Sequence, residues 1–141
     1  MSPRAVGVMP ELKTGRYSTF TADQGIAVAT SVGLPRFRLG YAIEHEIDAL
    51  KPFGLLKLPR DRFEVAYRKR LDLTGPERLR WQFQEIAAEH PGEPLVFLCF
   101  EDVSKQWCHR RLLADWWLER TGQLIPEIEL AQLTLTDQED R

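Results

Sequence analysis

The feature that most constrains the fold is an uninterrupted apolar run at residues 94–100, with the sequence PLVFLCF. Its apolar residues do not alternate with polar ones, which indicates a strand that is buried on both faces. Such strands are typical of parallel sheets that helices cover. The segment GIAVATSV at 25–32 is rich in small and β-branched residues and predicts a second buried strand.

Helical patterns lie between these strands and after them. Asp61 can cap a helix that runs to about Leu71, and Pro76 suits the first turn of a second helix that ends near residues 90–92. A third helix is expected from about Cys108 to Thr121, with Leu113, Trp116 and Trp117 contributing to packing and at least one tryptophan largely buried. This order predicts the α/β class: a single compact domain with a mostly parallel sheet flanked by helices, with Val28 and Phe97 at its centre.

The chain divides into an irregular N-terminal arm at 1–15, one α/β domain at 16–136 and a tail at 137–141. Weaker patterns within the domain predict a short strand at 17–20, a short helix at 42–50 and a short strand at 55–58. Partial alternation at 126–136 predicts a terminal strand.

The composition limits the partners and the cellular location that we expect for this chain. The 141 residues include 19 basic and 21 acidic ones, and this slight acidity argues against tight non-specific binding to DNA. The sequence has no secretion signal and no apolar run of the length that a membrane helix needs, so we expect a cytoplasmic protein without a membrane partner. Eight basic and four acidic residues lie within 57–80, a pattern that fits either a phosphate-binding patch or solvated helix faces.

The residues with chemical potential cluster between Cys99 and Arg111. Cys99 ends the apolar strand, Glu101 lies in the following loop, and Cys108 and His109 open the next helix. Ligands of open α/β sheets bind beyond the carboxyl ends of strands, and a helix start favours anions and thiolates. Arg110, Arg111 and, after the 25–32 strand, Arg36 add positive charge for a phosphate or carboxylate group.

Each of these residues also has a purely structural interpretation. Cys99 fits a buried apolar position, and His109 fits a histidine that is hydrogen-bonded to the loop. The two cysteines and His109 could bind zinc, but eight residues separate the cysteines, and neighbouring helical residues point in different directions. We therefore expect no metal and no cofactor.

The run LVFLCFEDVSKQWCHRRLLADWW resembles the bacterial and viral family called domain of unknown function 488. That family carries an apolar strand ending in Leu-Cys, an acidic residue, and Cys-His-Arg at a helix start. Here those elements are Leu98, Cys99, Glu101, Cys108, His109 and Arg110. Two earlier segments, RYS at 16–18 and GLPRFRLGY at 33–41, are also similar, so the resemblance covers about 12–130.

The resemblance implies a compact α/β fold but no known activity. It also implies one pocket that is shared by Arg16, Tyr17, Ser18, Arg36, Glu101, Cys108, His109 and Arg110. The first functional hypothesis is therefore binding of a phosphate-bearing or other anionic ligand, such as a nucleotide or nucleic acid, at the 108–111 helix start. The second is a small enzyme with Cys108 as nucleophile, His109 or Glu101 in proton transfer and Arg110 as the oxyanion partner. The third is a non-catalytic interaction protein.

Overall fold

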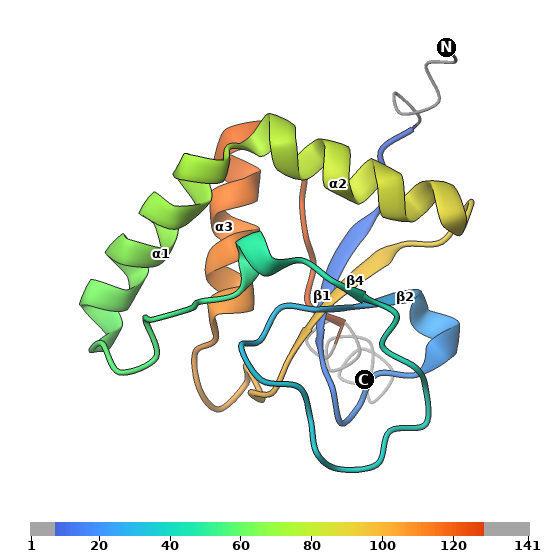
Figure 1. The fold of residues 1–141 in the computed structure, drawn as a ribbon, viewed down its shortest axis with the longest axis horizontal. Coiled ribbons are helices and arrows are strands. Elements are labelled where there is room, and N and C mark those ends of the chain that lie inside the picture. The colour runs from blue at the N-terminus through green and yellow to red at the C-terminus, as the bar shows by residue number, and fades with distance from the viewer. Residues whose placement is uncertain (1–7, 129–141) are drawn as a thin grey trace, which may run out of the picture.

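The computed structural model describes residues 8–128 and contains one sheet of four parallel strands (Figure 1). The strands are β1 (Leu12–Arg16), β2 (Ile26–Ala29), β3 (His45–Glu46) and β4 (Leu95–Cys99), and their order is β1-β4-β2-β3. Val28 pairs with Phe97 between the two central strands, as predicted. All strand pairs are parallel, so the expected α/β class is confirmed.

Within residues 8–128 the sheet is accompanied by three α-helices: α1 (Arg60–Thr74), α2 (Pro76–Glu89) and α3 (His109–Thr121). Pro76 lies in the first turn of α2, where its missing N–H has no intrahelical partner to lose. Helix α3 ends at Gly122, whose φ of 80° is left-handed and therefore favours glycine. Both Trp116 and Trp117 of α3 are fully buried, which confirms the prediction that at least one of them is.

The two faces of the sheet bury separate apolar clusters. Leu95 and Phe97 of β4 point to the face on which the three helices pack, whereas Val96 and Leu98 point to the opposite face. On that opposite face, the partly buried residues Leu39, Tyr41 and Ile43 come from the loop after β2. Burial on both faces explains why the 94–100 run lacks polar alternation.

Several short segments differ from expectation. The irregular arm predicted at 1–15 overlaps a strand, because β1 occupies 12–16 and pairs along its length with β4. Gly15 lies within this strand, although glycine is typical of irregular segments, and an added Cβ there would be 3.3 Å from the Leu98 side chain. Residues 17–19 form a turn instead of a strand, and turns also replace the strand expected at 55–58.

The helix expected at 42–50 is a two-residue edge strand, β3, followed by a 3-10 turn at Asp48–Leu50. The strand expected at 126–136 falls partly outside the described residues, and its described part forms one isolated bridge, between Thr14 and Glu127. Helix α3 starts one residue later than predicted, with Cys108 as its N-cap. No helix in residues 8–128 has the length and apolar character that crossing a membrane requires.

Candidate functional site

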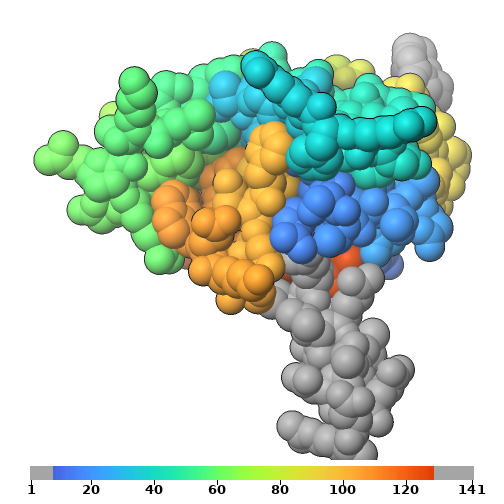
Figure 2. Space-filling model, turned by 90° about the horizontal axis from the view of Figure 1, so that it is seen from below, coloured from blue at the N-terminus to red at the C-terminus, as the bar shows by residue number. Residues whose placement is uncertain are grey.

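The candidate site lies at the carboxyl ends of the strands. Figure 2, seen from below Figure 1, shows the segments after β1 (blue), β2 (cyan) and β4 (orange) gathered on one face. A parallel sheet brings these segments together because all its strands end at the same edge. This edge holds Tyr17 after β1, Thr30 after β2, and Cys99 and Glu101 at the end of β4.

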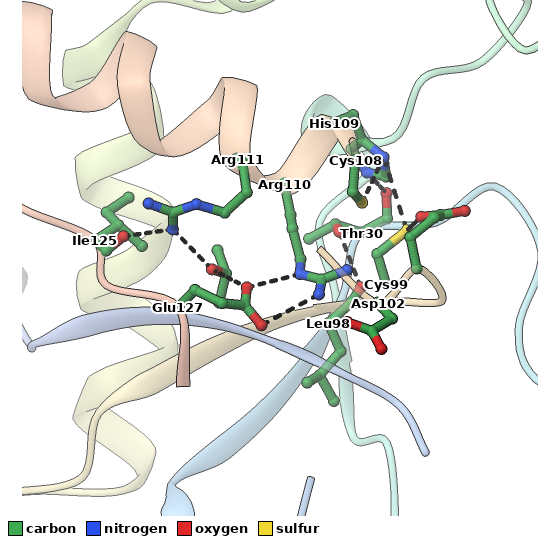
Figure 3. Close-up of polar contacts among 12 residues, drawn as sticks. Thr30, Leu98, Cys99, Asp102, Cys108, His109, Arg110, Arg111, Ile125 and Glu127 are labelled. Carbon is green, nitrogen blue, oxygen red and sulfur yellow. Dashed lines mark hydrogen bonds and ion pairs between the residues drawn. The ribbon is translucent and has the colours of Figure 1, made fainter. Parts of the chain in front are cut away.

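Cys99, Cys108 and His109 form a buried cluster at this edge (Figure 3). Nδ1 of His109 lies 3.7 Å from Cys99 Sγ and 3.8 Å from Cys108 Sγ. Cys108 has extended backbone angles, φ −146° and ψ 146°, whereas His109 is the first helical residue. This change of conformation lets two adjacent side chains reach the same cluster, which a continuous helix would not allow.

The hydrogen bond on the other side of the imidazole sets the role of each nitrogen. Nε2 of His109 lies 2.8 Å from the Thr30 carbonyl oxygen, which can only accept, so Nε2 carries a proton. In the neutral ring Nδ1 is therefore the basic nitrogen, and it faces the two sulfurs. His109 is held in a geometry that lets it accept a proton from a thiol.

The two thiols have opposite ionisation behaviour. Burial raises the pKa of Cys108, but hydrogen bonds with Cys99 and His109 and the charges of His109 and Arg110 outweigh burial and bring it to about 3. Hydrogen bonding to Cys108, together with burial, raises the pKa of Cys99 well above its usual range. Cys108 is therefore the thiolate of the pair, and Cys99 stays protonated.

Arg110 is fully buried beside this cluster. Its Nε and Nη2 donate to the two carboxylate oxygens of Glu127, at 2.9 and 3.1 Å, as Figure 3 shows. Glu127 also accepts from Thr14 Oγ1 at 2.7 Å. The third guanidinium nitrogen, Nη1, is buried without a hydrogen-bond partner among the described residues. The positive charge of Arg110 thus serves both Glu127 and the nearby Cys108.

A groove of about 260 Å³ opens onto the cluster. Cys108 and His109 line it together with Glu101, whose Oε1 accepts from Cys99 Sγ at 3.2 Å. Its other lining residues are Leu56, Leu58, Phe63, Gln106 and Trp107. Burial and the charge of Cys108 raise the pKa of Glu101. The groove therefore combines apolar walls with a thiol, an imidazole and a carboxyl group.

The structure brings some of the remaining predicted residues to this edge. Tyr17 is buried, and its hydroxyl lies 2.7 Å from Ser31 Oγ. Arg16 forms an ion pair with Asp102, at 3.7 Å, in the loop after β4. Ser18 and Arg36 are exposed, and no described contact joins either of them to the Cys108 cluster.

Several other basic residues have partners within the chain. Arg111 donates through Nη1 to Thr14 Oγ1 and to the Ile125 carbonyl oxygen. In the 57–80 stretch, Arg60 pairs with Glu64 and Arg80 with Glu77 along their own helices. These pairs support the interpretation of that stretch as solvated helix faces.

Two groups in the described residues have the composition and spacing to hold a metal ion. Cys99, Cys108 and His109 place their ligand atoms within 4.8 Å of one another, as do Glu44, His45 and His90 elsewhere on the surface. The spacing argument against the first group loses its force, since Cys108 lies outside the helix. However, the positive end of α3 and the Arg110 guanidinium both favour an anion at Cys108 over a cation.

Glu127 and Thr30 are the residues of the site that the sequence did not reveal. Thr30 acts through its backbone carbonyl, which has no sequence signature. Glu127 interrupts an apolar segment two residues after buried Ile125 and is itself buried. An acidic residue at a buried position is the available signal, since a buried carboxylate needs a cation such as that of Arg110.

The comparisons with known proteins give no information on function, so the functional argument rests on the geometry of the site. No protein-family model matches the chain, and neither a curated protein nor a solved structure matches it. The family resemblance described above therefore stays a prediction.

Proposed function

We propose that the chain is a small enzyme in which Cys108 is the nucleophile. One observation carries the proposal: Nδ1 of His109 lies 3.8 Å from Cys108 Sγ, while its Nε2 is held by the Thr30 carbonyl oxygen. Nδ1 takes the thiol proton in this geometry, and the imidazolium then lies beside the thiolate that it has formed. The N-terminus of α3 and the Arg110 guanidinium stabilise the same negative charge.

The proposed reaction is substitution at an electrophilic carbon of a ligand that is bound in the groove. The Sγ–carbon bond forms, the bond to the leaving group breaks, and the leaving group takes the proton that His109 carries. The apolar walls of the groove, Leu56, Leu58 and Trp107, suit a ligand with an apolar or aromatic part. Cys99 keeps its proton, donates it in a hydrogen bond to Glu101 Oε1 and lies beside the thiolate as a positioning residue.

Alkylation with iodoacetamide, followed by mass spectrometry of the intact chain and its peptides, tests this proposal. For an ordinary thiol with a pKa of about 8.5, the thiolate fraction falls roughly 500-fold between pH 8.5 and pH 5.5. We expect the alkylation rate of Cys108 to fall less than about tenfold over that range, with Cys99 resistant. The Cys108→Ser variant, the matched control, should not react at pH 5.5. A fall in the Cys108 alkylation rate of roughly 500-fold, as for an ordinary thiol, would contradict the proposal.

The zinc content of the purified chain is measured in the same experiment. We expect Cys108 to react without prior treatment with a chelator. One zinc ion per chain, together with thiols that react only after chelation, would identify Cys108 as a metal ligand and overturn its assignment as a free nucleophile.

Binding of a phosphate-bearing ligand is the second candidate, and one observation favours it. Nη1 of Arg110 is buried without a partner, so this nitrogen has an unused donor beside the start of α3. A thermal-shift series with nucleotides and sugar phosphates tests this hypothesis. It compares the wild type with Arg110→Lys, and Arg38→Ala, which changes an exposed arginine, is the control. Equal shifts in the wild type and Arg110→Lys would contradict it.

A further inference from the structure

Two of the chain's three histidines meet on the surface, away from the Cys108 cluster. His45 belongs to the edge strand β3, and His90 caps the C-terminus of α2. Their Nε2 atoms are 3.2 Å apart, and their rings are nearly perpendicular, at 89°. A hydrogen bond between the two imidazoles accounts for this distance only if one ring donates and the other accepts.

A carboxylate completes a set of three possible ligands. Glu44, the neighbour of His45, places Oε2 4.0 Å from Nε2 of His90. The three ligand atoms all lie within 4.8 Å of one another. Two imidazole nitrogens at about 2.0–2.1 Å from a tetrahedral zinc ion are themselves about 3.3 Å apart, which is close to the observed 3.2 Å. The Glu44 side chain is 64% exposed, so it can move the short remaining distance.

The surroundings of this group favour a cation. Glu93 places Oε2 4.0 Å from Nδ1 of His90, the nitrogen that faces away from the other ligands. A carboxylate that accepts a hydrogen bond from this nitrogen orients a metal-binding imidazole and raises its basicity, and Glu93, whose side chain is 50% exposed, can close the short remaining distance. Hollows flank both histidines, and their lining includes the acidic residues Glu85 and Glu89 but no Lys or Arg. The C-terminus of α2 adds the negative end of a helix dipole.

We propose that Glu44, His45 and His90 bind a divalent transition-metal ion, with zinc as the ion that fits their geometry. Two imidazoles and one carboxylate are a ligand set of zinc sites that keep one position open for water. The bound ion would tie β3, which has only two residues, to the end of α2. This site is independent of the thiol chemistry proposed for Cys108, since the two groups share no residue.

Titration of the full chain with zinc chloride, followed by NMR of the imidazole protons, tests the site. Because the chain has three histidines, each ring can be assigned from single His→Ala variants. We expect the signals of His45 and His90 to shift together and saturate at one zinc ion per chain, while the signals of His109 follow a separate curve or none. Binding should also raise the melting temperature.

Variants separate the metal site from a simple hydrogen bond. His90→Ala and Glu44→Gln should each weaken zinc binding by at least about tenfold. Loss of a residue that only hydrogen-bonds to a metal ligand already weakens binding by about that factor, and loss of a ligand itself should weaken it no less. Glu77→Gln, which removes a carboxylate at the other end of α2, is the control and should leave the affinity unchanged. Absence of any shift at His45 and His90 up to millimolar zinc, or equal affinity in Glu44→Gln and Glu77→Gln, would overturn the proposal.

Discussion

Arg110 links the stability of the fold to the chemistry of the site. Its guanidinium is fully buried and makes a two-pronged contact with Glu127, which is also buried. Removing two charges from water is costly, and the pair tolerates burial because the hydrogen bonds to Glu127 are aligned. The same cation lies close enough to Cys108 to lower its pKa. Arg110, which the sequence predicts to bind a ligand, thus binds Glu127 of the same chain.

A first prediction concerns this ion pair. Glu127→Ala leaves the Arg110 charge buried without its carboxylate, and it should lower the free energy of unfolding by about 3–5 kcal/mol. Arg120→Ala breaks a pair with Asp72 whose side chains are about 40% exposed, and it should lower that free energy by less than about 1 kcal/mol. Urea unfolding followed by tryptophan fluorescence measures both. Similar losses in the two variants would contradict the assignment.

A second prediction concerns Gly25, the residue before β2. Its φ is +144°, and a Cβ there would lie 2.6 Å from the Pro94 carbonyl oxygen, so alanine is both strained and obstructed. Gly25→Ala should lower the free energy of unfolding by about 1–3 kcal/mol. Gly33→Ala, where an added Cβ meets nothing within 4 Å, is the control and should change it little. Equal melting temperatures for the two variants would refute this explanation.

Among the site residues, the sequence predicts the cysteine and histidine cluster better than the residues around it. The strand end and helix start bring Cys99, Glu101, Cys108 and His109 together, because a parallel sheet aligns its carboxyl ends. The exposure of Arg36 depends on the path of the loop after β2, which no periodic pattern encodes. The pairing of Arg110 with Glu127 joins residues 17 positions apart and depends on how the chain returns after Gly122.

At the scale of elements, α3 joins the core to the site. Its first turn contributes His109 and Arg110, and its middle buries Trp116 and Trp117 beneath α1 and α2. The ring of Trp117 contacts Phe83 of α2 at 5.1 Å between centroids, and Trp116 Nε1 donates to Asp72 of α1. Packing of these indoles therefore fixes the position of the helix start that carries the reactive residues.

A third prediction follows from this packing. Trp117→Ala should lower the free energy of unfolding by about 3–5 kcal/mol, since it removes a fully buried indole. Leu118→Ala, at the next position, is the matched control, because Leu118 is 41% exposed. Its effect should stay below about 1 kcal/mol. Chemical denaturation followed by far-ultraviolet circular dichroism distinguishes them, and an equal loss in both variants would contradict the burial of Trp117.

Elements with strong periodicity are predicted well, and short ones are not. The three helices follow from apolar spacing and helix-start residues, and the two central strands follow from continuous runs of apolar and small residues; their bounds agree with the structure to within a few positions. Strand β1 was missed because Pro10 and Gly15 look like breaks, although Gly15 is there to let the Leu98 and Val96 side chains approach. Edge strand β3 has two residues and takes its conformation from β2.

For the molecule as a whole, the two apolar clusters depend on the same central strands. β2 and β4 contribute to both faces of the sheet, so neither cluster can open without disturbing the other. The chain's three tyrosines lie in different parts of the fold. Tyr17 is at the candidate site, Tyr41 is in the loop after β2, and Tyr67 is in α1. Each hydroxyl is hydrogen-bonded, to Ser31, to the Tyr17 carbonyl oxygen and to the Leu50 carbonyl oxygen respectively.

The last prediction uses these tyrosines to report on global unfolding at high pH. Burial raises the pKa of Tyr17 and of Tyr41 to about 12, and it raises the pKa of Tyr67 well above its usual value. Phenols of the unfolded chain ionise near pH 10, so between about pH 10 and 12 the unfolded state binds fewer protons than the folded one. The contribution of the tyrosines to stability is therefore complete below pH 10 and is lost as the pH rises towards 12.

A titration of phenol absorbance at 295 nm, alongside circular dichroism, measures this behaviour. We expect the three phenols to stay protonated at pH 10 and then to ionise in one steep step that coincides with loss of the folded signal. The chain in guanidinium chloride, where all three should titrate near pH 10, is the reference. A phenol that ionises near pH 10 while the folded signal persists would show that its tyrosine is not buried as described. The absorbance change at that step would give the number of such residues.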